Sequence, residues 1–521
     1  MPDDKSLKTI TQHFSLQPLN KITLPDTPVK GVASDSRKVQ QGYVFFAWKG
    51  GNIDSHQFIP DALARGAIAV VGTEILQTDI PVPYFCVQDS RYELAGFAAY
   101  LQDFPAHKLT MIGVTGTDGK TTTTNFLYHI LKAAGKQAGM ISTVNAVIGD
   151  RVIDTGFHVT TPEAPEVQEY LAEMVKAGVT HVVLEATSHG LAQNRVAFCE
   201  FDQAVVTNIT HEHLDYHGSY EGYLASKTRL FQYVAEGTQK TSLIQPFAVL
   251  NMEDRSYSKL EEVTRDIPRI RYGLSDQADL WADGITNTEN GVDFIVHHEN
   301  TSFTFHTHLK GEFNVLNCLA AIGLAHFGLH IAINTIQTGI NQVHSLTGRM
   351  EEIHMGQNFR AFVDFAHTPF GLEAALKSAR KMTEGRVIAV FGSAGLRDKM
   401  KRRMMAEISS DLADITYLTA EDPRTESLDA ILAEMADAMA QKGKREGKEF
   451  YRVPDRGDAI RKAVTIAMPG DLVIACGKGH EQSMCFGTTE YAWDEKTAMQ
   501  AALGALLGVP APKMPYLPTQ E

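Results

Sequence analysis

The sequence predicts an α/β fold with three domains, and three observations carry this prediction. The chain has 521 residues, whereas one domain typically takes about 150. Short apolar runs alternate with helical periods, as in sheets whose faces are covered by helices. A glycine-rich loop near residue 116 separates one such run from a helical stretch. The composition, 44% hydrophobic and 21% charged, excludes disordered and coiled-coil classes.

Residues 1–105 are predicted to form a small N-terminal α/β domain. Strand-like apolar runs at 43–47 and 67–71 flank a helical stretch at 58–64. This alternation within a short segment indicates a compact α/β unit.

Residues 106–345 are predicted to form a central P-loop-like domain. A strand at 109–114 turns through the glycine-rich loop into a helix at 121–134, which is the layout of a nucleotide-binding βα unit. Two later strand-like runs end on Glu185 and on a histidine-rich loop after residue 207. Polar groups therefore gather at the carboxyl ends of strands, where open α/β sheets bind ligands.

Residues 346–521 are predicted to form a C-terminal Rossmann-like domain. Strand-like runs alternate here with helical stretches, at 360–365, 386–391, 415–418 and 471–476. This pattern is typical of a second doubly wound sheet.

Charge and cysteine content narrow the class of protein further. The chain has 48 Lys and Arg against 62 Asp and Glu, a net charge of −14, which disfavours nucleic acid or an anionic membrane as a partner. Five cysteines without a Cys-x-x-Cys pair fit a reducing compartment, and we expect them to be small buried hydrophobic residues. Residues 1–21 lack the apolar core of a signal peptide, and no apolar run reaches the ~18 residues of a membrane span. We therefore expect a cytoplasmic protein without membrane insertion.

The glycine-rich loop has the residues of a phosphate-binding loop, Gly113-Val-Thr-Gly116-Thr-Asp-Gly119-Lys120-Thr121. Its glycines let backbone N–H groups close around phosphate oxygens, Lys120 would reach the β- and γ-phosphates, and the Thr121 hydroxyl would hold Mg²⁺. Val114 breaks the strict Gly-x-x-x-x-Gly-Lys-Thr spacing, and a surface turn before a helix cap is the alternative. The flanking strand and helix favour phosphate binding, with ATP as the ligand.

A second polar cluster follows downstream. It comprises Glu185-Ala-Thr-Ser-His-Gly190, a loop with histidines at 211, 213 and 217, and Lys227. A carboxylate and an imidazole near a triphosphate can hold a second Mg²⁺. Zinc is disfavoured because neither cysteine nor a fourth ligand accompanies the histidines. Loop capping and solvent contact remain the alternative for His211 and His217.

These residues resemble the Mur ligase family, the ATP-dependent ligases that build the peptide stem of bacterial peptidoglycan. The match spans nearly the whole chain. Besides the phosphate loop, its motifs are His213-Leu-Asp-Tyr-His-Gly218, Leu309-Lys-Gly-Glu-Phe-Asn-Val-Leu-Asn317-Cys-Leu-Ala-Ala, Gly348-Arg-Met-Glu351, Val363-Asp-Phe-Ala-His-Thr-Pro369 and Gly477-Lys-Gly-His-Glu481.

Within the family the chain resembles the MurE type, which adds a diamino acid to UDP-N-acetylmuramoyl-L-alanyl-D-glutamate. Typical of that branch are Ser34-Asp-Ser-Arg37, Thr160-Thr-Pro162, and Glu421-Asp-Pro-Arg424 together with the motif at 477–481.

The resemblance implies a mechanism in which ATP phosphorylates the D-glutamyl carboxylate and the incoming amine attacks the acyl phosphate, expelling phosphate. It implies Lys120, Glu185, His213 and Lys227 as catalytic residues, and Thr121, Glu185, His213 and a carbamylated Lys227 as Mg²⁺ ligands. The alternative for Lys227 is a solvated helix lysine. The implied ATP-binding residues are Gly116, Thr117, Asp118, Gly119, Lys120, Thr121, Thr122, Asn317, Arg349, Asp364 and His367.

The remaining implied residues bind the other two substrates. Those for the UDP-muramoyl dipeptide are Ser36, Thr160, Thr161, Thr187, Gln193 and Arg195. Those for the amino acid are Arg397, Glu421, Asp422, Arg424, Gly477 and Glu481. For Asn317 and Gln193 a structural amide is the alternative.

Four positions depart from the family pattern. Asp118 stands where Asn is common, so we expect its side chain to point away from phosphate or to approach metal. Thr187 replaces a usual serine and keeps the hydroxyl. Glu421 and Asp422 replace the Asp and Asn of an Asp-Asn-Pro-Arg motif.

Charges near Arg424 indicate the third substrate. Arg424 offers a bidentate fork for a carboxylate, as at the far end of meso-diaminopimelate, while Asp422 and Glu481 offer anions for an ammonium. A pocket with positive and negative side chains favours diaminopimelate, whose far end carries both charges, whereas the extra carboxylate of Asp422 favours L-lysine or ornithine. Arg424 could instead pair internally with Asp422 or Glu426.

Two other functions compete with this one. A folylpolyglutamate synthase-like ligase shares the loop and the acyl-phosphate logic, but the segment before Pro105 counts against it. A non-catalytic Mur-like scaffold is disfavoured by the presence of Lys120, Glu185, His213 and Lys227.

Overall fold

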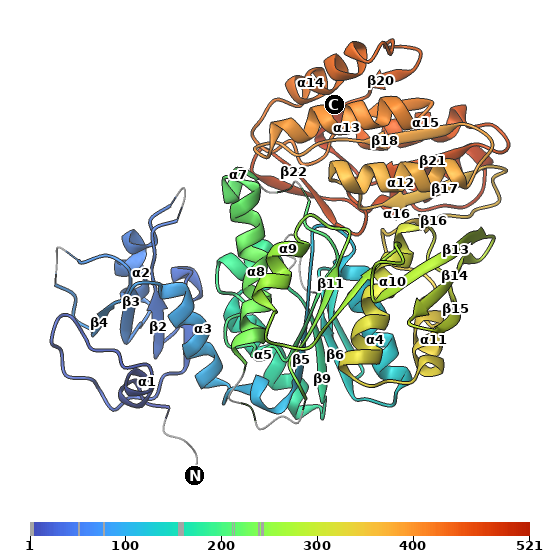
Figure 1. Cartoon of the computed structure of the whole chain (residues 1–521). Coiled ribbons are helices and arrows are strands. Elements are labelled where there is room, and N and C mark those ends of the chain that lie inside the picture. The colour runs from blue at the N-terminus through green and yellow to red at the C-terminus, as the bar shows by residue number, and fades with distance from the viewer. Residues whose placement is uncertain are drawn as a thin grey trace.

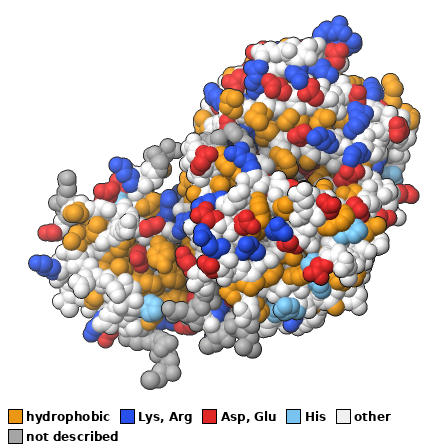
Figure 2. Space-filling view, in the orientation of Figure 1, with side chains coloured by type: hydrophobic (Ala, Val, Ile, Leu, Met, Phe, Trp, Pro, Cys, Tyr) orange, Lys and Arg blue, Asp and Glu red, His pale blue; other side chains and the backbone are white. Residues whose placement is uncertain are grey.

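Three large sheets, one in each part of the chain, organise the fold of this computed structural model (Figure 1). The structure describes residues 5–50, 53–76, 79–154, 161–210, 212, 214–237, 240 and 244–520. The N-terminal part lies beside the central part, and the C-terminal part lies against another side of it (Figure 1). On the face seen in Figure 2, acidic and basic side chains are intermixed over the molecule.

The N-terminal part contains a four-stranded parallel sheet in the order β1-β2-β3-β4. Helix α3 begins after Asp89, whose carboxylate accepts the N–H groups of Arg91 and Tyr92, and packs against the central part through α5. The elements are α1 (Leu7–His13), β1 (Gly31–Ala33), η1 (Ser36–Lys38), β2 (Tyr43–Phe46), η2 (Ser55–Phe58), α2 (Ile59–Ala64), β3 (Ala69–Gly72), β4 (Tyr84–Cys86), α3 (Ser90–Leu101) and η3 (Pro105–Lys108).

The central part contains an eleven-stranded sheet in the order β15-β14-β13-β12-β11-β10-β5-β9-β6-β7-β8. Its middle strands are parallel, and antiparallel hairpins extend both edges. The elements are β5 (Thr110–Thr115), α4 (Lys120–Ala133), β6 (Ala138–Ile141), β7 (Asn145–Ile148), β8 (Arg151–Asp154), α5 (Ala164–Lys176), β9 (His181–Glu185), α6 (Ser188–Ala192), β10 (Gln203–Val206), α7 (Leu214–His217), α8 (Tyr220–Glu236), β11 (Phe247–Asn251), α9 (Tyr257–Val263), β12 (Arg269–Gly273), β13 (Leu280–Thr288), β14 (Gly291–His298), β15 (Thr301–Thr307), α10 (Phe313–Gly323), the π-helical turn η4 (Leu324–Gly328) and α11 (Ile333–Asn341).

The C-terminal part contains a six-stranded sheet in the order β16-β17-β21-β18-β19-β20, parallel except for β16, and a separate β22-β23 hairpin. The elements are β16 (Glu351–Glu352), β17 (Arg360–Asp364), α12 (Pro369–Lys381), β18 (Val387–Phe391), α13 (Lys399–Leu412), β19 (Ile415–Leu418), α14 (Leu428–Gln441), β20 (Phe450–Arg452), α15 (Arg456–Ile466), β21 (Leu472–Cys476), β22 (Ser483–Phe486), β23 (Thr489–Ala492), α16 (Glu495–Leu507) and η5 (Pro518–Gln520).

Strand β5 is buried on both faces, which explains its continuous apolar sequence. Ile112 and Val114 face the core that includes α4, whereas Met111 faces the opposite core. Helix α4 contributes Phe126 and Ile130 from the same helical face. The two cores hold the loop between β5 and α4 at the carboxyl edge of the sheet.

The three-domain α/β fold expected from the sequence is confirmed. The predicted strands coincide, within two residues at each end, with β2, β3, β5, β9, β10, β17, β18, β19 and β21. The cysteine expectation is wrong in part, because Cys86 is exposed and Cys485 is partly exposed, and all five thiols are unpaired. No described helix has the length and apolar character that a membrane crossing needs.

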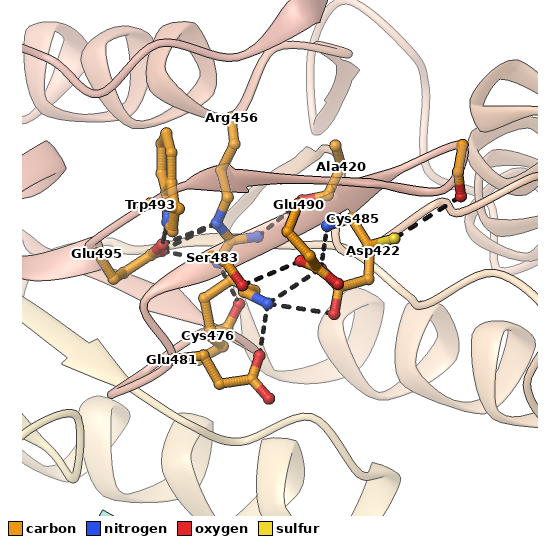
Figure 3. A network of polar contacts seen from close by, with 12 residues as sticks. Ala420, Asp422, Arg456, Cys476, Glu481, Ser483, Cys485, Glu490, Trp493 and Glu495 are labelled. Carbon is orange, nitrogen blue, oxygen red and sulfur yellow. Dashed lines mark hydrogen bonds and ion pairs between the residues drawn. The ribbon is translucent and has the colours of Figure 1, made fainter. Parts of the chain in front are cut away.

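A fully buried ion pair fixes the loops that follow β19 and β21 of the C-terminal sheet (Figure 3). Arg456, at the start of α15, lies 2.7 Å from the Glu495 carboxylate, which also accepts the indole N–H of Trp493 at 2.6 Å. The same guanidinium donates to the carbonyls of Ala420 at 3.0 Å and Cys476 at 2.7 Å. Arg456 therefore ties together the chain segments that follow β19 and β21.

We expect Arg456→Met to lower the free energy of unfolding by about 3–5 kcal/mol, because it leaves the Glu495 carboxylate buried without its cation. Adding Glu495→Gln should recover part of this loss. The control is Arg452→Met, which removes a partly exposed pair with Glu446 and should cost less than about 1 kcal/mol. Urea unfolding of the variants measures the difference, and equal losses for the Arg456 and Arg452 variants would contradict the role of the buried pair.

Candidate functional site

The glycine-rich loop is held against the carboxyl end of β10. The Thr117 N–H donates to the Asn208 carbonyl at 2.7 Å, and the Asp118 N–H donates to the Asn208 side chain at 3.0 Å. Gly119 caps α4 with φ +83°, in the left-handed region that favours glycine. A Cβ there would lie 2.2 Å from Asn317 Oδ1, so only glycine fits this close approach.

A buried carboxylate lies directly beside the loop. Glu185, the last residue of β9, is 1% exposed and accepts hydrogen bonds from the Thr121 hydroxyl at 3.0 Å and the Thr143 hydroxyl at 2.8 Å. Arg349, from the C-terminal part, donates to Thr121 Oγ1 at 3.2 Å. Hydroxyl and carboxylate oxygens are the ligands that Mg²⁺ prefers, so the side chains of Thr121 and Glu185 fit this ion.

Two buried lysines approach the same loop. Lys227 Nζ donates to the Gly116 carbonyl at 2.5 Å and lies 4.8 Å from the centre of the Tyr223 ring. Lys120 Nζ donates to the Thr117 carbonyl at 2.8 Å. Burial lowers the pKa of both ammonium groups, that of Lys227 to well below its usual value, and Lys120 adds repulsion there. The alternative of a solvated lysine at position 227 is wrong.

Two cavities adjoin the loop. The first, the asparagine cavity, has about 310 Å³ and includes Asn208, Asn251, Asn314 and Asn317 in its lining. The second, the intersheet cavity, has about 230 Å³ and lies between residues that follow β5 and β9 on one side and β19 and β21 on the other. The carboxyl ends of two parallel sheets therefore meet at one polar space.

Most residues implied by the sequence lie at these two cavities. The asparagine cavity is lined by Asp118, Gly119, Thr121, Thr122, Asn317, Arg349 and Asp364. The intersheet cavity is lined by Thr117, Asp118, Gly119, Lys120, Thr121, Glu185, Thr187, Lys227, Arg349, His367, Arg397, Glu421, Asp422, Arg424, Gly477 and Glu481. His367 thus lies on the side of the intersheet cavity, and burial lowers its pKa well below the usual value.

The other implied residues that the structure describes do not line either cavity, although Thr161, Gln193 and Arg195 connect to Thr187, which does. The Thr161 hydroxyl lies 2.9 Å from that of Thr187, and Arg195 donates to the Thr161 carbonyl at 2.9 Å and to the Gln193 amide oxygen at 2.7 Å. Ser36 is buried in the N-terminal part, where its hydroxyl bonds Asp61. Thr160 and His213, like His211, lie outside the described residues.

Asp118 points toward the C-terminal part. Its Oδ2 accepts the Thr368 hydroxyl at 3.1 Å, and burial raises the pKa of its carboxyl group. A second contact across the intersheet cavity joins Lys401 and Glu212, 3.6 Å apart. The sequence interpretation did not include Thr368, Lys401 or Glu212, although Thr368 lies within a quoted motif and Glu212 lies beside one.

Lys478 is the main residue that the sequence interpretation missed, although it stands inside the motif at 477–481. Its fully buried ammonium lies 3.1 Å from Asp422 and 2.5 Å from Glu481. These carboxylates raise its pKa despite burial. Asp422 also accepts the Cys485 N–H at 2.9 Å. Both predicted anions of the amino-acid pocket are thus already paired with an internal cation.

Arg424 differs from Lys478, because no ion pair joins its side chain to another described residue. Asp422 binds Lys478, and Glu426 binds Arg402 at 2.6 Å, so neither acid pairs with Arg424. Within the described part of the chain, the hydrogen bonds of Arg424 are those of its backbone, to Cys485 and Gly487. Among the described residues, no three His, Cys, Asp or Glu side chains form a metal-binding group.

Models of known protein families match most of the chain. The Mur ligase middle domain matches residues 114–325, the glutamate ligase domain of Mur ligases matches 348–479, and the catalytic domain of the Mur ligase family matches 28–95. A UDP-N-acetylmuramyl-tripeptide synthetase of Roseiflexus sp. is 40% identical over 506 residues, covering 96% of this chain and 98% of the relative.

Two further comparisons cover nearly the full length. A UDP-N-acetylmuramoyl-L-alanyl-D-glutamate–2,6-diaminopimelate ligase of Geobacillus kaustophilus is 39% identical over 470 residues, covering 90% of this chain and 94% of the relative. A solved structure of a ligase with the same name has a TM-score of 0.63 and 29% identity, covering 93% of this chain and 96% of that one.

A phosphate loop that faces a second α/β sheet across a polar cavity defines a multidomain nucleotide-dependent enzyme. The chain belongs to the Mur ligase family, whose members are ATP-dependent amide-bond-forming ligases.

We expect Gly119→Ala to weaken nucleotide binding by about 1–3 kcal/mol, because a side chain at this left-handed position is strained and collides with Asn317. Gly135→Ala is the matched control, since Gly135 follows the other end of α4 with φ +71° and has no atom within 4 Å of an added Cβ. Calorimetric titration with ADP measures Kd for both variants. Equal affinities would show that the loop does not hold the nucleotide at Gly119.

Proposed function

We propose that the chain ligates meso-diaminopimelate to UDP-N-acetylmuramoyl-L-alanyl-D-glutamate through an acyl phosphate, in the cytoplasm, as a step of peptidoglycan synthesis. The observation that carries this proposal is the intersheet cavity, whose walls combine a phosphate loop with Arg424, a guanidinium that forms no ion pair with another described residue. The names of the relatives from Geobacillus and of the solved ligase support it. Five cysteines without a disulfide fit a reducing compartment.

We assign the three parts of the chain to the three substrates. Residues 1–105, 106–345 and 346–521 each contain one of the large sheets, and we assign them to the UDP moiety, ATP and the amino acid. Ser36 then meets the uridine, and Thr160, Thr161, Thr187, Gln193 and Arg195 line the path of the dipeptide. The remaining ATP contacts come from residues that line the two cavities beside the loop, namely Asn317, Arg349, Asp364 and His367.

The loop residues promote phosphoryl transfer by position and charge. Lys120 neutralises charge on the transferring phosphoryl group, and loop N–H groups orient it. Thr121, Glu185, His213 and a carbamylated Lys227 would hold Mg²⁺, which supplies further charge neutralisation when bound. The lowered pKa of Lys227 supports carbamylation, because CO₂ reacts with the neutral amine.

The charges of the amino-acid pocket favour diaminopimelate over lysine or ornithine. Lys478 offsets one of the two carboxylate charges of Asp422 and Glu481, and so reduces the excess negative charge from Asp422 that favoured lysine or ornithine. Arg424 has no ion-pair partner among the described residues and lines the cavity. A guanidinium with an unfilled fork suits a carboxylate, and diaminopimelate has one at its far end.

The direct test uses ATP, the UDP-dipeptide and one of three amino acids: meso-diaminopimelate, L-lysine or L-ornithine. Phosphate release and the mass of the UDP-tripeptide are measured. We expect acceptor-dependent release and a diaminopimelate product. Release that is indifferent to the dipeptide would overturn the ligase assignment, and a product with lysine or ornithine alone would overturn the choice of amino acid.

Lys227→Ala should be nearly inactive and partly rescued by added formate or acetate, because a carboxylate replaces the anionic oxygen of the carbamate. The control is Lys259→Ala, which removes an exposed helix lysine. This variant should keep the parent activity and should not be stimulated by formate or acetate. Initial rates with and without carboxylate measure the effect. Substantial activity of Lys227→Ala alone would contradict the carbamate role.

Arg424→Ala should raise the KM for diaminopimelate by an amount equivalent to about 2–5 kcal/mol, since it removes a charge-assisted bidentate contact. Use of L-lysine should be unchanged or improved, because lysine lacks the distal carboxylate. Arg403→Ala, which removes an exposed arginine paired with Glu407, is the control. Steady-state rates at varied concentrations of each amino acid give KM for the parent and the variants. An unchanged KM for diaminopimelate would reject this contact.

A further inference from the structure

The Glu421 carboxylate is a buried acid that the proposed function leaves without a chemical role. It follows β19, is 5% exposed and lines the intersheet cavity. Its Oε2 has no hydrogen-bond partner among the described residues. A buried carboxylate oxygen without a partner is costly, so its retention beside a cavity points to a ligand.

The surrounding backbone holds Glu421 in place. The carbonyl of the preceding Ala420 accepts the buried Arg456 guanidinium at 3.0 Å. A Cβ on Gly477, which has φ +112°, would lie 2.4 Å from Glu421 Oε2, so the carboxylate packs directly on the glycine α-carbon. These contacts fix the acid between the loops that follow β19 and β21.

Charged groups from several elements act on Glu421. Lys401 of α13, Arg456 of α15 and Lys478 after β21 favour its ionised form, whereas the neighbouring Asp422 disfavours it. Burial outweighs the three cations and raises the pKa of Glu421 to about 7. An acid with this property is half ionised near neutral pH, which suits a group that accepts and then releases a proton.

We propose that Glu421 is the general base that deprotonates the attacking amino group of the incoming amino acid. This inference rests on the proposed acyl-phosphate ligation. An amino acid enters with its amine as ammonium, which has no lone pair for attack. Glu421 lines the same cavity as Lys120 and Lys227 on the phosphate-loop side and Arg424 of the proposed amino-acid pocket.

The proposed step balances in atoms and charge. Glu421 accepts one proton from the ammonium, and the freed nitrogen lone pair forms a bond to the D-glutamyl carbonyl carbon. The bond from that carbon to the phosphate oxygen breaks, and the second proton lost by the nitrogen leaves with hydrogen phosphate. Glu421 releases its proton to solvent after the product leaves.

A simple binding role predicts different kinetics. If Glu421 only pairs with the ammonium as an anion, its removal raises the KM for the amino acid and leaves kcat near normal. A general base contributes about 10²–10⁴-fold to the rate, and its loss lowers kcat. The loss of the base also removes the limb of the pH profile that reports the ionisation of Glu421.

The test compares the parent enzyme with Glu421→Gln, Glu421→Asp and Glu434→Gln. Glu434 pairs with Arg402 outside the cavity lining and is the matched control. Amide formation is measured from below to above pH 7 with diaminopimelate. A parallel assay replaces the amino acid with hydroxylamine, which is largely unprotonated at neutral pH and traps the acyl phosphate as a hydroxamate without a base.

We expect the parent kcat/KM to rise with pH through about 7, because the base must be ionised. Glu421→Gln should lose about 100-fold or more in kcat and lose this limb, yet form hydroxamate within a few-fold of the parent rate. Glu421→Asp should restore part of the rate and the limb, and Glu434→Gln should match the parent.

Three outcomes would overturn the general-base role: a retained pH limb in Glu421→Gln, a change confined to KM, or an equal loss of hydroxamate and amide. A parent enzyme that forms no hydroxamate with ATP and the UDP-dipeptide would instead refute the acyl-phosphate ligation itself. The two failures are therefore distinguishable.

Discussion

The cost of burying charge between two sheet edges is the constraint on which the site depends. Lys120, Lys227, Asp118 and Glu421 lie in the intersheet cavity, and burial shifts the pKa of each toward the neutral form. The cations and anions do not pair fully with one another. In the proposed ligation, a phosphate, a metal ion and an ammonium would bring opposite charge to these positions, so substrate binding would relieve a cost that the folded chain already bears.

The fully paired buried charges have a different role. Arg456 with Glu495, and Lys478 with Asp422 and Glu481, are satisfied by close partners, and the pKa values of both cations are raised despite burial. Arg456 binds the backbone carbonyls of Ala420 and Cys476, and Lys478 lowers the net negative charge around Asp422. Pairing therefore separates residues that build the pocket from residues that are available for chemistry.

Local sequence patterns predicted the frame of this site well. The loop between β5 and α4, and the acid at the end of β9, were predictable because each depends on a strand, a turn and a helix that are adjacent in the chain. The antiparallel strands β13 to β15 were not foreseen, since they do not follow the alternating pattern used to divide the chain. Lys478 and Asp422 are 56 positions apart, and their contact follows from loop geometry that no local pattern encodes.

Contacts across the intersheet cavity decide how near the two reacting groups can come. Arg349 reaches Thr121, Thr368 reaches Asp118, and Lys401 faces Glu212, so each contact joins the C-terminal part to the loop side. Proton transfer and amine attack both need heavy-atom separations of about 3 Å. In the proposed ligation the central sheet holds the acyl phosphate, so the amino-acid pocket of the C-terminal sheet alone cannot supply that spacing. The contacts that bridge the sheets thus help to set the distance between the two groups that react in the proposed ligation.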